Sequence, residues 1–226
     1  MPGTPSLLPM FPLSAVLFPQ ASMPLHVFEE RYRELTRVCL EGDGRFGVVL
    51  IERGSEVGGG DQRSDAGTRG VITHAAALPD GRWVLRVQGE ARIAVEDWLP
   101  DDPYPRALVT EWPAHDADAD ADADADSVTD AASETLASVL TDTEQRLRRA
   151  RALLAEHGGA PALPPDEVFD PGDPETATWR LCASAPVTAY DAQRLLVAPG
   201  TAARLDLLSR LMDDLELDLQ RLHTPG

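Results

Sequence analysis

Short apolar runs interrupted by prolines open the chain and predict strands. The runs span residues 7–10, 15–18 and 25–27, and prolines stand within or between them. Because proline cannot donate a hydrogen bond to a neighbouring strand, it favours sheet edges, bulges and turns over central positions. We therefore expect short strands at the margins of a sheet.

The segment from Phe28 to Gly42 has helical periodicity instead. Charged residues separate its apolar positions, which are Phe28, Tyr32, Leu35, Val38 and Cys39. Spacings of three and four residues place such side chains on one face of a helix, and Gly42 supplies a stop signal. The pattern predicts one early helix, with Phe28 as its principal core residue.

Strand patterns return after this helix. Residues 46–52 (FGVVLIE) predict a buried strand, and the glycine-rich stretch 54–67 predicts a mobile surface loop. Alternating and β-branched residues then predict four further strands. These strands are expected at residues 68–78, 82–88, 91–98 and 107–112.

Two turns are predicted within this series of strands. Pro79-Asp80-Gly81 combines a proline, which presets φ, with a glycine, which accepts a positive φ. Gly89-Glu90 is the natural place for the second turn. Several short strands with one helix favour closure into a small barrel, because closure protects the edges of a sheet.

Alternating aspartate and alanine residues at 116–126 mark an abrupt change of composition. Such a tract cannot bury apolar surface and repels itself, so it predicts an extended, solvated linker. It lacks the glycine and the glutamate that a calcium-binding loop needs at fixed positions, so we expect no calcium site. The sequence thus predicts a β-rich domain at residues 1–114, an acidic linker at 115–126 and a helical domain at 127–226.

The predicted helical domain has clear start signals. A long helix is expected over residues 127–157. Asp173, followed by Pro174, provides an N-cap and a first-turn proline for a second helix. Thr188 and Asp191 resemble a capping box for a third, short helix.

The last predicted helix, from residue 201 to about 223, has the strongest periodicity. Apolar residues recur at alternating spacings of three and four, at Leu205, Leu208, Met212, Leu215, Leu219 and Leu222. This spacing is that of a coiled-coil seam, and leucines at 207, 211 and 217 widen the stripe. We favour packing inside the chain's own bundle and leave dimerisation open, so a monomer or a weak homodimer is expected.

Charge and composition narrow the chemistry. The formal net charge of −18 opposes binding to phosphate backbones, so we expect no nucleic-acid partner. All 20 basic residues are arginine, and the chain has no lysine. A P-loop lysine, a Ser–Lys dyad and lysine covalent chemistry are therefore excluded from these residues. No apolar stretch reaches the length of a membrane span, so no membrane association is expected.

Nothing in the remaining residue types indicates a catalytic or metal site. Cys39 and Cys182 lie far apart without a CxxC motif, which is typical of reduced thiols in a cytoplasmic protein. The histidines lack ligand spacing, and no serine stands in a GxSxG motif. We expect no catalytic residue, no metal and no cofactor, and so no enzyme.

Two small groups of polar and aromatic residues are candidates for binding a partner. They are His26, Glu29, Arg31 and Tyr32 around the early helix, and His74, Arg82 and Arg86 on the later strands. Aromatic residues and arginine often anchor interfaces, and a His/Arg pair can hold a carboxylate. Each group also has a structural interpretation, in which the first ties the helix to the sheet and the second is ordinary strand surface.

Three stretches together resemble the N-terminal, substrate-binding domain family of Lon proteases. The first is LPMFPLSAVLFPQASMPLHVFEERYREL, a proline-rich strand pair leading into a helix. The second is AGTRGVITHAAALPDGRWVLRVQGEARIAV, similar to the family's meander. The third is RLCASAPVTAYDAQRLLVAPGTAARLDLLSRLM, similar to the helical bundle that follows it. The resemblance extends over residues 7–222, and the Asp/Ala tract departs from the family.

The resemblance implies an α+β fold, in which a PUA-like β pseudobarrel with one early helix precedes a C-terminal α-helical bundle. In Lon, that region precedes an ATPase and a peptidase and helps to engage unfolded substrates. It implies here a stand-alone, non-catalytic binding module for polypeptide segments or a partner protein. The alternative is a PUA-like protein that binds nucleic acid or a small molecule.

Overall fold

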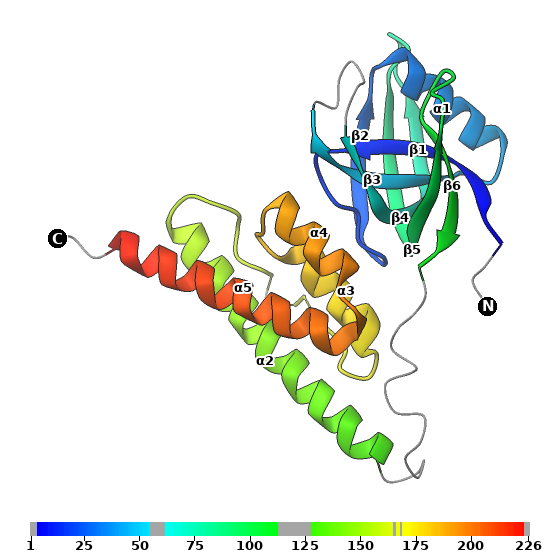
Figure 1. The fold of residues 1–226 in the computed structure, drawn as a ribbon. Coiled ribbons are helices and arrows are strands. Elements are labelled where there is room, and N and C mark those ends of the chain that lie inside the picture. The colour runs from blue at the N-terminus through cyan, green and yellow to red at the C-terminus, as the bar shows by residue number, and fades with distance from the viewer. Residues whose placement is uncertain (1–3, 55–61, 113–127, 165, 168, 224–226) are drawn as a thin grey trace. The chain divides into compact units, whose positions relative to one another are not determined.

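The computed structural model describes residues 4–54, 62–112, 128–164, 166–167 and 169–223 of the chain. The chain divides into two compact units, Met1–Pro113 and Ala114–Gly226 (Figure 1). The first unit contains the strands and one helix, and the second contains helices. The predicted acidic linker, residues 115–126, lies outside the described residues, and the boundaries predicted for the two domains stay a prediction.

A mixed six-stranded sheet builds the first unit. Its elements are β1 (Ser6–Leu13), β2 (Ser22–Val27), α1 (Glu30–Glu41), β3 (Arg45–Arg53), β4 (Gln62–Ala77), β5 (Trp83–Leu99) and β6 (Arg106–Glu111). The strand order is β2-β5-β4-β3-β1-β6, and β5 also pairs with β6, so the ladder returns to β5. Among the described strand pairs, β1 and β3 run parallel and the others are antiparallel.

The expectation that the proline-bearing strands lie at the margins holds for β2 and is wrong for β1. β1 lies between β3 and β6 in the strand order. Its first half, through Pro9, pairs with β6, and its second half, which contains Pro12, pairs with β3. Each half thus has a partner on one side only, which leaves a side where a missing N–H costs no ladder bond.

Residues 15–18 do not form a strand, contrary to the sequence-based expectation. Leu17 and Phe18 are nevertheless buried, because this connection passes over the sheet. Thr68 donates a hydrogen bond from its hydroxyl to the Leu17 carbonyl at 2.5 Å, which fixes the connection to β4. The apolar character of residues 15–18 therefore reflects burial and does not indicate a strand.

Two predictions about the middle of the chain are wrong. β4 begins at Gln62, so part of the expected glycine-rich loop is strand, while residues 55–61 lie outside the described part. Gly89-Glu90 is not a turn, because β5 runs through it without a break. The register with β4 shifts here instead: Arg69 is aligned with Ala91 and Gly70 with Gly89, so Glu90 is the extra residue of a bulge in β5. The turn at residues 79–81 is confirmed: Leu78 donates to Arg82 at 2.8 Å, and φ of Gly81 is +83°.

The early helix is confirmed, but Phe28 is not in the core. α1 begins at Glu30, so Phe28 lies in the short link between β2 and α1, where its side chain is 55% exposed. Tyr32 and Leu35 take the core positions instead, 4% and 0% exposed. The helical phase that the sequence suggested starts two residues later than Phe28 because β2 continues to Val27.

Four helices form the described part of the second unit. They are α2 (Val128–Glu156), α3 (Pro174–Ser184), α4 (Ala189–Val197) and α5 (Gly200–His223). Both predicted caps are confirmed: Asp173 accepts from the Thr176 N–H, and Thr188 accepts from the Asp191 N–H, each at 3.1 Å. The predicted first residue of α2, at position 127, lies outside the described part.

The apolar stripe of α5 faces the other helices of its own unit. Leu205, Leu208, Met212 and Leu219 are buried, and α5 packs along α2 and against α3 and α4. Leu217, which the sequence placed at the side of the stripe, is 50% exposed. The side chain of Leu222 lies outside the described part. Packing within the unit accounts for the stripe.

Candidate functional site

An open apolar groove lies beside β2 in the first unit. We call it the β2 groove; its volume is about 380 Å³. Its walls are formed by Phe11, Leu13, Pro24, Leu25, His26, Val27, Phe28, Glu29 and Tyr32. These residues come from β1, from β2 and from the link into α1, so the groove exists only when the three segments are folded together.

Stacked aromatic rings form one wall of the β2 groove. The rings of Phe11 and Tyr32 lie 4.1 Å apart between centroids and are nearly parallel, at 11°. Phe46 packs behind them, with its centroid 6.0 Å from that of Phe11. All three belong to one buried cluster of the sheet interior. The groove therefore opens onto the main core of the unit, and Phe28 is the exposed aromatic residue at its rim.

The first group of candidate residues gathers around this groove. His26, Glu29 and Tyr32 line it, with His26 exposed and Tyr32 buried. Arg31 does not line it, but its Nε lies 3.1 Å from Glu29 Oε2 and its guanidinium 4.4 Å from the Tyr32 ring centroid. Arg31 thus holds Glu29 and covers Tyr32, which are its neighbours at the start of the helix.

The second group is divided by the structure. His74 is aligned with Arg86 across β4 and β5, and Arg86 with Pro24 across β5 and β2. Directly opposed residues share a face of a sheet, and so do residues two apart, so His26 lies on this exposed face as well. Arg82 stands apart in the turn before β5, where its Nε lies 2.7 Å from Asp80 Oδ2.

Phe28 is the residue of this site that sequence reasoning misplaced. Its apolar side chain suggested a core position, whereas the structure puts it at the rim of the β2 groove. The available signal was its position directly after the strand residues PLHV, before the charged EERYR run. Where the strand ended relative to the helix start could not be read from spacing alone.

A second groove of the first unit lies between α1 and the β4–β5 turn, with a volume of about 380 Å³. Its walls carry two acidic and two basic residues, Glu30, Glu34, Arg33 and Arg37. Arg37 pairs with Glu34 of the same groove at 2.6 Å and with Glu41 at 2.5 Å. Because its charges balance, this groove is a weaker candidate for recognising a ligand than the β2 groove.

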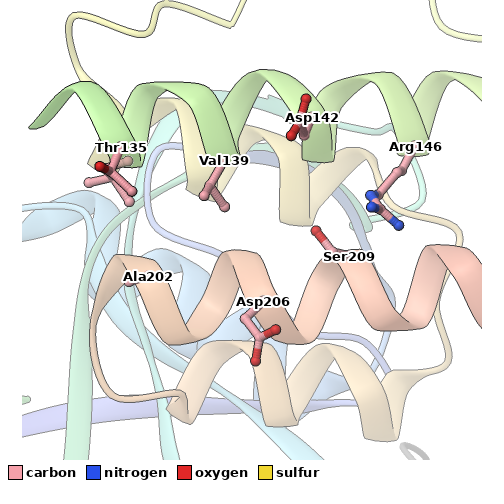
Figure 2. A pocket seen from close by; sticks show the side chains of 8 residues that line it. Thr135, Val139, Asp142, Arg146, Ala202, Asp206 and Ser209 are labelled. Atoms are coloured by element: carbon pink, nitrogen blue, oxygen red, sulfur yellow. The ribbon is translucent and has the colours of Figure 1, made fainter. Parts of the chain in front are cut away.

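The second unit has a groove of about 590 Å³ between α2 and α5. Figure 2 shows Val139 of α2 and Ser209 of α5 pointing into the gap, while the carboxylates of Asp142 and Asp206 point away from it. The hydroxyls of Thr143 and Ser209 are 2.8 Å apart and link the two helices beside the groove. Sequence reasoning missed this groove because its walls come from helices far apart in the chain.

Many titratable groups of the described residues are held in ion pairs. No cluster of three or more His, Cys, Asp or Glu residues in the described part could hold a metal ion. Two arginines, Arg45 and Arg69, share Glu90, at 2.8 and 3.2 Å. The hydrogen bond from Arg45 is the main reason why the pKa of Glu90 lies below its usual value. Within the same residues, no helix is long and apolar enough to cross a bilayer.

Both thiols are buried, and burial raises the pKa of Cys39 and of Cys182 to about 12. Since the thiolate is the reactive form, we expect both cysteines to react with Ellman's reagent at least about 100-fold more slowly in the native protein than in denaturant. The measurement is the rate of absorbance increase with and without guanidinium at mildly alkaline pH. Rapid labelling of either cysteine in the folded protein would contradict the assignment of both as core residues.

Known proteins with similar sequences include Lon proteases. That of Cytophaga hutchinsonii is 32% identical over 108 residues, which are 47% of this chain and 13% of that protein. That of Desulfosudis oleivorans is 29% identical over 167 residues, which are 72% of this chain and 19% of that protein. The chain thus spans less than a fifth of the length of either relative.

The fold has solved counterparts. The crystal structure of a Lon N-terminal domain protein from Xanthomonas campestris superposes with a TM-score of 0.59 at 27% identity, covering 90% of this chain and 96% of that one. A family model described as the ATP-dependent protease La (LON) substrate-binding domain matches residues 7–214. Because the match takes in both units, the chain belongs to the family of the Lon substrate-binding domain.

Proposed function

We propose that this chain binds exposed apolar segments of other polypeptides and does not itself catalyse a reaction on them. The observation that carries the proposal is the β2 groove, an open apolar surface with Phe28 exposed at its rim. Monomeric proteins seldom expose large apolar side chains beside a concave apolar surface without a use for them. The description of the family as a substrate-binding domain agrees with this role.

We also propose that the first unit is a PUA-like pseudobarrel. The observation that supports this is the ladder β5-β4-β3-β1-β6, which returns to β5. The proposed lack of catalysis by these residues is supported by a sequence without lysine and by two buried thiols. Hydrolysis or ATP use would then belong to a separate protein or domain.

Binding of nucleic acid by the barrel is the less favoured alternative. It would need arginines such as Arg45, Arg53, Arg63 and Arg69 to present a common basic face. Three of the four are instead paired with a carboxylate, Arg45 and Arg69 with Glu90, and Arg63 with Asp101 at 2.9 Å. Together with the net charge of −18, these pairs leave little positive potential for phosphate.

Substitution of Phe28 tests the proposed site. We expect Phe28→Ala to weaken the binding of fluorescein-labelled, unstructured apolar peptides about tenfold, because an exposed aromatic at a groove rim is a typical anchor. The dissociation constant is measured by fluorescence anisotropy. The stability of the protein should stay nearly unchanged, because the Phe28 side chain is 55% exposed.

Leu7→Ala is the matched control, since Leu7 is 56% exposed and lies on β1 outside the groove. It should leave the peptide affinity unchanged. Equal losses for the two variants would place binding elsewhere. No binding by the unmodified protein beyond that of an unrelated acidic protein would refute the proposed function itself.

A further inference from the structure

We propose that the β2 groove takes its ligand as an added strand on the outer edge of β2. The ligand would be an extended segment with apolar side chains at alternate positions, with no acidic residue and with basic residues at its ends. The inference rests on the proposed function and adds the conformation and the side-chain pattern of the bound segment. Pairing of a peptide with a sheet edge gives affinity through the backbone and selectivity through side-chain pockets.

The backbone of β2 has an edge that no described strand occupies. β2 pairs with β5 alone among the described strands, in an unbroken antiparallel register. Next to this ladder, Gly89 donates its N–H to the Ala21 carbonyl at 2.9 Å. Because the groups of successive residues alternate between the two edges, residues 23, 25 and 27 bond toward β5.

The same alternation turns the backbone groups of residues 22, 24 and 26 toward the outer edge. Ser22 and His26 supply N–H donors there, and all three residues supply carbonyl acceptors. Pro24 has no N–H, and its place in an outward-facing position costs the β2–β5 ladder nothing. The outer edge can therefore exchange several backbone hydrogen bonds with an extended partner.

The groove lies along the inner face of this edge. Leu25 and Val27 line it with buried side chains, whereas Pro24 and His26, which also border the groove, have exposed side chains on the opposite face of β2. The side chains of an added strand alternate in the same way, so every second one would face the groove. There it would meet the stacked rings of Phe11 and Tyr32. This geometry selects apolar residues at alternate positions.

The charges around the groove set the character of the ends of the ligand. Glu29 lines the groove and Glu30 is exposed immediately after it. No arginine of the described residues lines the groove, and the neighbouring Arg31 is already paired with Glu29. The chain as a whole carries a net charge of −18. A segment without acidic residues and with arginine or lysine at its ends is therefore the complementary one.

The test uses the full chain and a seven-residue peptide that alternates valine or leucine with threonine between terminal arginines. Two N-methylated versions carry methyl groups on alternate amides, one on each edge of the strand. We expect one version to lose at least about tenfold in affinity and the other to bind as the parent does, because a strand presents alternate N–H groups to each edge. A helical or irregular ligand would not show this alternation.

Two variants of one residue test the same contact from the protein side. Ser22→Pro removes an outward N–H without removing a bond to β5, so peptide affinity should fall about tenfold while the melting temperature is retained. Ser22→Ala keeps the N–H and should bind as the unmodified protein does. Amide exchange at Ser22 and His26 should also slow when the peptide is bound.

The outcomes separate the two levels of the proposal. A peptide that binds, with equal affinity for both N-methylated versions and for both Ser22 variants, overturns edge pairing and leaves polypeptide binding intact. Equal binding of a peptide with the same composition but without alternation also overturns it. Binding of neither this peptide nor any unstructured apolar peptide overturns the proposed function as well.

Discussion

Arg204→Ala should destabilise the second unit by about 3 kcal/mol, from the loss of charge-assisted hydrogen bonds and of a close cation–π contact. Arg204 is 0% exposed, although arginine is almost never fully buried without partners. The loss is measured by urea unfolding followed by circular dichroism at the helical band. Most of this signal comes from the second unit, which contains α2 to α5.

The geometry explains why this arginine has so large an expected effect. Its Nε donates to the Leu195 carbonyl at 3.1 Å and its Nη2 to the Ala198 carbonyl at 3.2 Å, both at the end of α4. Its guanidinium lies 3.6 Å from the ring centroid of Trp179 on α3. One side chain of α5 thus caps α4 and packs on α3, and its truncation leaves carbonyls without donors.

Two further variants identify the cause. Arg204→Met keeps much of the side-chain volume over Trp179 and loses the donors, so a loss close to that of alanine would assign the effect to the hydrogen bonds. Arg210→Ala removes an arginine of the same helix that is exposed and pairs with Asp206 at 2.6 Å. Its loss should stay below about 0.5 kcal/mol. An Arg204→Ala protein as stable as Arg210→Ala would show that Arg204 does not join the helices.

Gly89→Ala is the second substitution with a large expected effect, a loss of about 3 kcal/mol in the first unit, because added volume cannot be accommodated against a fixed backbone. A Cβ at this position would lie 2.2 Å from the Phe18 carbonyl oxygen. The backbone cannot retreat, because Gly89 also accepts from the Gln20 N–H at 3.0 Å and donates to the Ala21 carbonyl at 2.9 Å. Thermal unfolding followed by tryptophan fluorescence measures the loss.

Gly42→Ala is the matched control for this substitution. Gly42 has φ of −100°, and a Cβ there would come no closer than 3.5 Å to any atom. The substitution should change stability by no more than about 0.5 kcal/mol, as is usual for surface positions without special constraints. Equal effects of the two glycine substitutions would show that the connection formed by residues 18–21 does not lie as close to β5 as described. Because this connection leads into β2, Gly89→Ala should also weaken peptide binding.

Features governed by neighbours in the sequence were determined by the sequence itself. The caps at Asp173 and Thr188 and the turn at residues 79–81 were predicted correctly because the groups that satisfy them lie within four residues. The stripe of α5 was predicted for a related reason, since a regular helix fixes which side chains share a face. Length, charge and the absence of lysine likewise limited the chemistry before any fold was known.

Features governed by distant segments were decided only by the tertiary structure. A glycine at position 89 is as compatible with a turn as with a strand, and the approach of Phe18 selects the strand. The prolines of β1 suggested a margin until the split of its partners between β3 and β6 became visible. Nothing in the periodicity of α5 marks Arg204 as buried, and only the tertiary structure shows it fully enclosed, with contacts to α3 and α4.

Some features of the candidate site could likewise be predicted from the sequence, and others required the tertiary structure. His26, Glu29 and Tyr32 could be selected from the sequence because aromatic and charged residues cluster there, and they do line one groove. That Phe28 is exposed at its rim, and that no described strand occupies the outer edge of β2, depends on where β2 ends and which strands pair with it. Periodicity specifies which residues of an element face the same way. What they face is set by the burial of apolar surface between segments far apart in the chain.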